Sequence, residues 1–193
     1  GLYSNCPPAS ISQVRLFYQA IAPAYRRHVE PSRAHQLAAF VPLFAPGSRV
    51  LDASCGDGTF AKMAGKKLKV WCNDLSPAML ALIPRRLAPP SRRSVSSASR
   101  LPHPAASFDG VLHSFSNLHS FDRRAFASFF RVLRNGGLLA YHPVKAPGER
   151  WPPHFHARTL AALRKAGFHS VESKWLESAG KKKTRLRVYL ARK

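Results

Sequence analysis

Residues 50–58 read VLDASCGDG, and the order of residue types around this stretch decides the fold. Its apolar start is typical of a short buried strand, and Gly56 and Gly58 allow a tight turn into the helical spacing of 59–64. A second apolar run, 68–74, follows and ends in an acid. This order forms a βαβ unit, which predicts a parallel sheet with a ligand at the carboxyl ends of its strands.

The carboxylates of this unit indicate what kind of ligand it holds. Asp52 and Asp57 flank the glycines, which favours a ligand with a cationic end over a pyrophosphate. Asp74 suits ribose hydroxyls, which are neutral donors. The loop is neither G-x-G-x-x-G nor a Walker A pattern. The alternative is that Gly56 and Gly58 only make the turn, but together with the acids they favour an adenosine-type pocket.

The rest of the chain alternates between helical and strand patterns. Helical spacing is found at 11–22, 31–44, 78–83, 123–133 and 157–165. Strand patterns are found at 110–113 and 138–142, with a weaker one at 94–98 and a closing pair at 170–177 and 184–190. Residues 135–137 are expected to cap the helix 123–133. The alternation predicts an α/β sheet with helices on both faces and a terminal antiparallel hairpin.

Charge is the anomaly in the composition. The chain of 193 residues has 31 Lys and Arg against 9 Asp and Glu, a formal net charge of +22. Such a balance predicts contact with a polyanion such as RNA, DNA or an anionic membrane surface. The basic residues are spread along the sequence, which suits RNA-rich surroundings without sequence reading. The alternative is a solubility device, or the high pI common among mitochondrial proteins.

Length and residue usage narrow the class further. The length fits one domain, and a hydrophobic content of 45% fits a globular core. No apolar run approaches the roughly 18 residues of a membrane span. The three cysteines lack the spacing of a disulfide scaffold or a zinc module. The chain starts at Gly1, so we expect a removed leader or a fragment, and a removed presequence would place the protein in mitochondria.

With these patterns in place, the chain resembles a class I S-adenosylmethionine-dependent methyltransferase of the small, single-domain type. Residues 50–58 are similar to the first motif of that family, and 70–80 to the second, with Asp74 in the ribose-binding place. Residues 101–111 resemble the segment before the fourth strand, and 131–139 the helix-to-fifth-strand signature. The resemblance implies a Rossmann-like, mostly parallel seven-stranded sheet with a C-terminal antiparallel hairpin. It also implies an N-terminal helical lid or arm at 1–46 and a methyltransferase-like α/β domain at 47–193.

The resemblance implies S-adenosylmethionine as cofactor. The cofactor-binding residues that it implies are Tyr25, Asp52, Ser54, Gly56, Asp57, Gly58, Asp74, Leu75, Ser97, Ala98 and Ser114. Two departures bear on this expectation. Ser54 replaces the first glycine of the loop, and 96–98 lacks the acid with which many relatives accept from the adenine amino group.

No catalytic residue is evident in the sequence. Methyl transfer needs in-line positioning and sometimes a base. His119 follows the fourth strand and could serve as a base, and the alternative is a surface or packed histidine. His142, His154 and His156 could imitate a metal site, but they lack a cysteine or carboxylate at ligand spacing, so no metal is expected.

Three functions remain open. The first is an RNA-contacting structural or assembly component of a ribonucleoprotein such as the mitochondrial ribosome, partnered by RNA and other subunits. The charge, Ser54, the missing acid and the prolines within 84–104 favour it narrowly. The alternative is an active methyltransferase on RNA or a small organellar metabolite, and its support is the set Asp52, Gly56, Gly58 and Asp74. A third is a structural subunit of another organellar complex.

Overall fold

The computed structural model describes residues 10–28, 33–117, 123–145, 150–178 and 183–193, and one mixed seven-stranded sheet organises them. The strand order is β3-β2-β1-β4-β5-β7-β6. The strands are β1 (Arg49–Asp52), β2 (Lys69–Asp74), β3 (Arg93–Val95), β4 (Phe108–Asn117), β5 (Leu133–Val144), β6 (Ser170–Glu177) and β7 (Arg185–Arg192). Strands β1 to β5 run parallel, and β7 lies antiparallel between β5 and β6. The predicted Rossmann-like methyltransferase fold with its closing hairpin is therefore confirmed.

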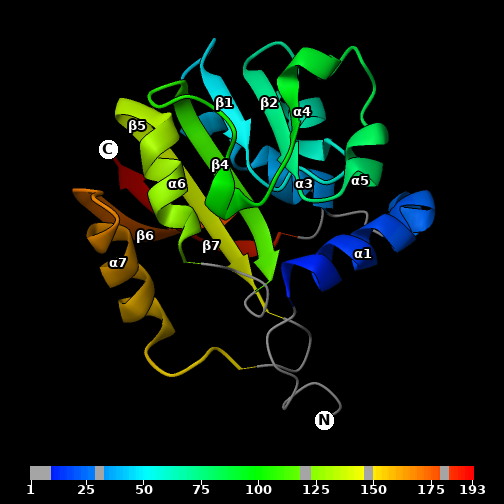
Figure 1. Cartoon of the computed structure of the whole chain (residues 1–193). Coiled ribbons are helices and arrows are strands. Elements are labelled where there is room, and N and C mark those ends of the chain that lie inside the picture. Colours follow the sequence, from blue (N-terminus) through cyan, green and yellow to red (C-terminus); the bar gives the residue numbers. More distant parts are fainter. Residues whose placement is uncertain (1–9, 29–32, 118–122, 146–149, 179–182) are drawn as a thin grey trace.

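Helices cover both faces of this sheet (Figure 1). They are α1 (Ile11–Ile21), α2 (Tyr25–His28), α3 (Arg33–Ala38), α4 (Thr59–Ala64), α5 (Pro77–Ala81), α6 (Ala125–Val132) and α7 (Phe155–Lys165). Helices α3, α4 and α5 build one core with Phe40 and Phe60 at its centre. Helices α6 and α7 build the second core, which contains Phe126, Phe129 and Tyr189. Apolar residues on both sides of each central strand explain why those strands read as continuous hydrophobic runs.

Helices α5 and α1 both begin at a serine N-cap. The Ser76 side chain accepts from the Met79 backbone N–H, and Pro77 occupies the first turn of α5. Helix α1 begins at a capping box in which Ser10 and Gln13 bond each other's backbone. Helix α1 leaves Leu16 and Phe17 exposed and lies beside α5 at the carboxyl ends of the strands (Figure 1). Of these described helices, none is both long and apolar enough to cross a membrane.

The proline-rich stretch after α5 is ordered by one arginine. The Arg93 guanidinium donates to the backbone carbonyl oxygens of Leu80, Ile83 and Ala88, at 2.7–3.0 Å. Buried carbonyl groups need such donors where prolines prevent regular pairing. Arg93 therefore holds this stretch against α5. Strand β3, which begins at Arg93, is only three residues long.

The predicted cap at 135–137 is wrong. Helix α6 ends at Val132, and β5 begins at once with Leu133, so 135–137 belongs to the strand. The register of β4 against β5 shifts between Phe108 and Gly110, which accommodates this irregular start. A glycine pair after a helical pattern indicates a helix end, but the end lies earlier because Leu133 is already extended and pairs with Phe108 of β4.

Candidate functional site

A pocket opens where β1, β2 and β4 end, beneath the N-terminal helices. Its lining gathers three of the nine acids of the chain, so we call it the acidic pocket. The residues that carry its chemistry are Tyr18, Tyr25, Arg33, Asp52, Ser54, Gly56, Asp57, Asp74, Leu75, Ser96, Ser97, Ala98, Ser99, His113, Ser114 and Phe115. Ten of the eleven predicted cofactor-binding positions lie in this lining. The topology brings them together because the carboxyl ends of parallel strands share one edge.

Asp52 stands at the base of the acidic pocket. Its side chain is buried, and its Oδ1 atom has no hydrogen-bond partner among the described residues. Burial raises the pKa of Asp52 to about 8; a backbone hydrogen bond from Ser54 opposes the rise, and the nearby Asp74 and Asp57 add to it. An orphaned buried carboxylate is costly unless a ligand satisfies it. Asp52 thus fits a cationic ligand group.

Asp74 is held in place by the backbone around it. Its Oδ2 accepts from the Gly56 N–H and its Oδ1 from the Ser76 N–H, both at 2.9 Å. Burial raises its pKa, and the backbone N–H donors oppose that rise. A carboxylate has about four acceptor sites, and the backbone N–H groups of Gly56, Leu75 and Ser76 occupy three of them, so one site remains for a hydroxyl donor of a ligand. Gly56 has a positive φ of 54°, which suits a residue without Cβ at this close approach.

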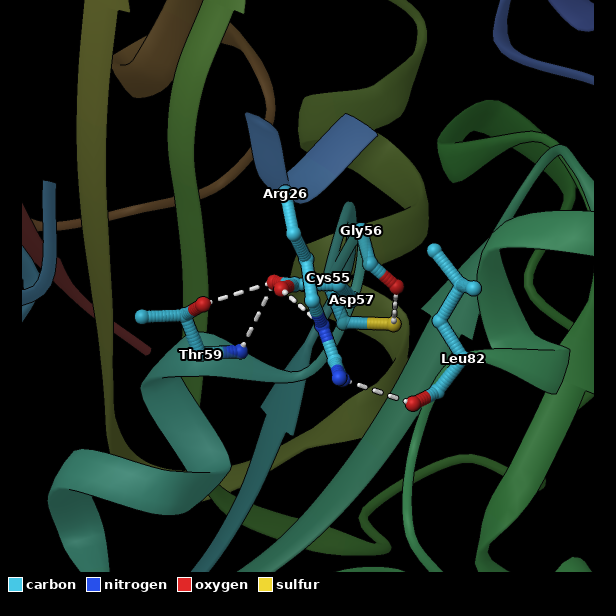
Figure 2. Close-up of polar contacts among 6 residues, drawn as sticks. All are labelled: Arg26, Cys55, Gly56, Asp57, Thr59 and Leu82. Atoms are coloured by element: carbon cyan, nitrogen blue, oxygen red, sulfur yellow. Dashed lines mark hydrogen bonds and ion pairs between the residues drawn. The ribbon is translucent and has the colours of Figure 1, made fainter. Parts of the chain in front are cut away.

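Asp57 joins the loop to the N-terminal arm, as Figure 2 shows. Its Oδ1 accepts from the Thr59 hydroxyl at 2.6 Å, at the start of α4. Its Oδ2 accepts from Arg26 Nε at 3.3 Å. The same guanidinium donates to the Leu82 carbonyl at 2.8 Å, so α2 is fastened to the loop and to the end of α5. Asp57 therefore acts as an anchor of the arm as well as a wall of the pocket.

The arm supplies two tyrosines and an arginine to the roof of the pocket. The ring centroids of Tyr18 and Tyr25 are 6.5 Å apart, and burial raises the pKa of Tyr25 to about 12. Both phenols are thus protonated donors at neutral pH; the pKa of Tyr18 is raised by burial as well. The Arg33 guanidinium lies 3.9 Å above the Phe115 ring, and its buried Nε has no hydrogen-bond partner among the described residues. Arg33 therefore fits an anionic ligand group beside the cationic one that Asp52 fits.

Both departures from the family pattern are compensated locally. Ser54 Oγ lies 3.0 Å from His113 Nδ1, which ties the loop to β4. Burial lowers the pKa of His113 to about 3, so that ring is neutral. Where the adenine acid is missing, Ser97 and Ser99 line the pocket with their hydroxyls 2.9 Å apart. A hydroxyl oxygen can accept from an amino group as a carboxylate does, though without the charge.

Gly58 is the predicted site residue that does not line the acidic pocket. It precedes α4 with φ +78°, and a Cβ there would approach Ile83 side-chain carbons at 3.0–3.3 Å. Because Gly58 has no side chain, Ile83 can pack closely behind the loop. Gly58 therefore has a structural role. His119, the candidate base, lies outside the described residues.

A second cavity adjoins the first. It lies between the β6–β7 hairpin, the carboxyl end of β5 and the start of α7, and we call it the hairpin cavity. Trp151, Phe155, Trp175 and Tyr189 give it aromatic walls. The two cavities share Phe115 in their linings. None of the described residues that line the hairpin cavity is acidic.

The histidines considered for a metal have other roles where their contacts are given. His142 Nδ1 lies 2.7 Å from the Arg187 carbonyl oxygen, and His156 Nδ1 lies 3.4 Å from the Tyr189 hydroxyl. Within the described ranges, no group of three or more His, Cys, Asp or Glu could hold a metal ion. Cys55 and Cys72 are buried free thiols, and burial raises the pKa of Cys55 well above its ordinary value.

Some lining residues escaped the sequence reasoning. Tyr18 stands seven residues before Tyr25, about two helical turns, and that spacing could have indicated it. Arg33 has no local signal, because its position depends on how the arm crosses the sheet. The aromatic residues of the hairpin cavity come from separate elements that no motif connects.

Comparison with known proteins agrees with this geometry. Residues 50–137 match the methyltransferase domain family. The ubiquinone/menaquinone biosynthesis C-methyltransferase of Bordetella parapertussis is 39% identical over 103 residues, which is 49% of this chain and 40% of that protein. The chain thus spans less than half of that relative's length.

Solved structures match over nearly the whole chain. The cyclase SpnF has a TM-score of 0.72 at 20% identity, covering 98% of this chain and 99% of its own. The Burkholderia thailandensis 1,6-didemethyltoxoflavin-N1-methyltransferase, solved with that substrate and S-adenosylhomocysteine, has a TM-score of 0.69 at 21% identity. It covers 98% of this chain and 92% of its own. At such identities the likeness shows a common fold.

Proposed function

Because residues 50–137 match the methyltransferase domain family and the whole chain shares the fold of solved S-adenosylmethionine-dependent methyltransferases, we propose that it is an active class I methyltransferase acting on a small organic molecule. The observation that carries this proposal is the Asp52 side chain in the acidic pocket, whose buried Oδ1 atom has no hydrogen-bond partner among the described residues. A scaffold that had lost its cofactor would gain nothing from this buried carboxylate, which an apolar side chain could replace at no electrostatic cost.

The pocket chemistry fits S-adenosylmethionine, the cofactor of the family. Asp52 and Arg33 would hold the ammonium and carboxylate of its methionine end, because each presents an orphaned polar atom in the same lining. Asp74 would accept from the ribose hydroxyls, and the hydroxyls of Ser97 and Ser99 would face the adenine. When bound, S-adenosylmethionine supplies a methyl group on a positively charged sulfur. The residues of this chain supply position, and the lid of α1 and α2 limits access of water.

Support for a small acceptor comes from the relatives. Those matched in sequence act in quinone biosynthesis, and the Burkholderia neighbour was solved with a small heterocyclic substrate. The hairpin cavity gives this chain a concave place of its own for such a molecule.

Calorimetric titration with S-adenosylmethionine and S-adenosylhomocysteine tests the proposal. We expect dissociation constants on the order of micromolar for the purified protein. Asp52→Asn should weaken S-adenosylmethionine binding at least tenfold, because the ammonium loses its charged partner. Glu172→Gln, which removes an exposed acid on β6, is the matched control and should bind as the original chain does. A folded protein that binds neither ligand at millimolar concentration would overturn the proposal.

The charge of +22 supports a second candidate, an RNA-contacting component of an organellar ribonucleoprotein. One local feature favours it: the guanidinium groups of Arg49 and Arg92 lie 4.8 and 4.7 Å from the Trp71 ring centroid, and none of these three residues lines the acidic pocket. RNA affinity that falls steeply with added salt, together with no cofactor binding, would favour this candidate over the enzyme. The organellar location stays a prediction.

A further inference from the structure

The hairpin cavity meets the acidic pocket at one strained residue. Phe115 has a positive φ of 56°, which a bulky residue rarely adopts. It sits where the register of β4 against β5 shifts between Ser114 and Ser116. Such a bulge redirects a side chain, and here the ring lies edge-on to His142, with centroids 5.0 Å apart. Strain of this kind persists where surrounding structure enforces it, and it often marks a functional site.

Flat aromatic surfaces line the hairpin cavity. The ring centroids of Trp151 and Phe155 are 4.8 Å apart with planes inclined by 31°, and Phe155 also contacts Tyr189 edge-on. Trp151 is 41% exposed and Trp175 is 48% exposed. Two tryptophans that keep this much of their surface open in one cavity are suited to cover a planar ligand.

Two arginines of β7 stand on the same face of the strand beside these rings. The guanidinium carbons of Arg185 and Arg187 lie 5.0 and 4.8 Å from the Trp175 ring centroid. Arg187 is directly opposite Trp175 in the β6–β7 register. Neither arginine forms an ion pair with a described acidic residue, so their charge is available to an anion.

His142 adds a neutral acceptor at the junction of the cavities. The Arg187 carbonyl can only accept, so His142 Nδ1 must carry the proton of that 2.7 Å hydrogen bond. The Nε2 atom is then the unprotonated nitrogen and can accept a hydrogen bond from a hydroxyl. His142 is 6% exposed, lies against Phe115 and lines the hairpin cavity, so it is largely shielded from bulk water.

We propose that the hairpin cavity binds the methyl acceptor, and that this acceptor is a small planar aromatic molecule carrying an anionic group. Its ring stacks on the exposed tryptophans, and its carboxylate or phosphate pairs with Arg185 and Arg187. The proposal rests on the proposed methyltransferase function, since it names the substrate class of that enzyme.

Four small probes test the proposal by quenching of tryptophan fluorescence in the presence of S-adenosylhomocysteine. They are 4-hydroxybenzoate, phenyl phosphate, phenol and cyclohexanecarboxylate. We expect the two anionic aromatics to bind at least tenfold more tightly than phenol, which lacks the anion, and than cyclohexanecarboxylate, whose ring is neither aromatic nor planar. The ratio between 4-hydroxybenzoate and phenyl phosphate distinguishes a carboxylate acceptor from a phosphate acceptor.

Variants assign the binding to the arginines. The double variant Arg185→Gln, Arg187→Gln should weaken the anionic aromatics at least tenfold and change S-adenosylmethionine affinity less than twofold. Arg164→Gln on the exposed side of α7 is the control and should change neither. Because the double variant could misfold, Arg187→Lys serves as a milder second variant that keeps the charge and loses the planar fork; it should show an intermediate loss.

The outcomes separate this proposal from the proposed function. A protein that binds S-adenosylmethionine and none of the anionic aromatics overturns the acceptor class and leaves the enzyme standing. Anionic aromatics that bind the double variant unchanged overturn the arginine assignment. If a single-stranded RNA binds far more tightly than the small probes, and its binding is lost in the same double variant, the claim that the acceptor is a small molecule is overturned. Absence of cofactor binding removes the proposed function, whatever the probes do.

Discussion

The acidic pocket and the hairpin cavity are neighbours with opposite chemistry. The first presents Asp52, Asp57 and Asp74, while the second presents Arg185 and Arg187 and no described acid. In a chain with only nine acids, the concentration of three in one pocket shows where negative charge is needed. The comparison teaches that the net charge of +22 conceals a local separation, in which a cationic ligand and an anionic ligand would meet at Phe115.

The opposite chemistry of the two cavities should appear most strongly in the pH dependence of stability. The largest effect is expected from Asp52 in the acidic pocket. Its folded pKa, about 8, lies above the ordinary value of 3.8, so the folded state retains a proton that the unfolded state loses. This contribution to stability is present below pH 3.8 and is lost as pH rises to about 8, by up to about 1.4 kcal/mol per pH unit. Asp52→Asn should therefore be more stable than the original chain at pH 8. The difference in unfolding free energy should be several times about 1.4 kcal/mol, because the loss accumulates over each pH unit between the two pKa values.

Urea unfolding of the cofactor-free protein between pH 5 and 9 measures this difference. The control is Glu172→Gln, which should follow the original chain at every pH. Equal stability of Asp52→Asn and the original chain at pH 8 would show that Asp52 is satisfied by a group of the protein.

His142 should give the opposite dependence in the hairpin cavity. Burial lowers its folded pKa to about 4 from 6.5; the Arg187 carbonyl opposes the shift, and the charge of Arg33 adds to it. Stability is then fully present above pH 6.5 and is lost as pH falls toward 4, by about 3 kcal/mol in total. His142→Gln should lack this part of the acid limb, whereas His169→Gln, at an exposed site, should retain it. An acid limb that is identical in both variants would contradict a neutral His142.

A pair of glycines tests the support behind the acidic pocket. Gly58→Ala should lower the unfolding free energy by roughly 2–3 kcal/mol, because a Cβ adds a clash with Ile83 to the strain of a positive φ. Gly47→Ala has a similar φ of +81° and nothing within 4 Å of its Cβ, so it should lose only about 1 kcal/mol. Thermal unfolding of both variants gives the comparison. Equal losses would mean that Ile83 moves aside freely.

The smallest expected effect concerns the arm over the acidic pocket. Arg26→Gln removes the ion pair with Asp57, and Arg26 is 58% exposed, so stability should change by less than about 1 kcal/mol. Release of S-adenosylhomocysteine should nevertheless become a few-fold faster, because α2 is less firmly fastened to the loop. Stopped-flow displacement measures that rate, with Arg27→Gln on the exposed side of α2 as control. An unchanged rate would show that the arm opens elsewhere.

The two regions also differ in how well sequence predicted them. The acidic pocket could be predicted from residues 50–58 and Asp74. The side chains that would bind the cofactor lie in two loops, and these loops have fixed places in a βαβ unit. The hairpin and its antiparallel pairing were predicted as well, from the alternation in 170–177 and 184–190. Arg185 and Arg187 belong to that predicted strand, yet their task was not visible in it. A cavity made of β5, β7 and the start of α7 depends on how elements dock, which local patterns do not record.

The strand order sets a sequence of events for the growing chain. Every described residue that lines the acidic pocket precedes β5, whereas β6 pairs with β7 alone among the described strands, and β7 follows β6 in the chain. Strand β6 is therefore connected to the sheet only through β7 among the described strands, and the contacts of β7 with β5 link residues more than 45 positions apart. The loops that would hold the cofactor are synthesised first, and the walls that would choose the acceptor arrive last. Along the chain, the segments that would hold the common reagent thus precede the hairpin that would select its target.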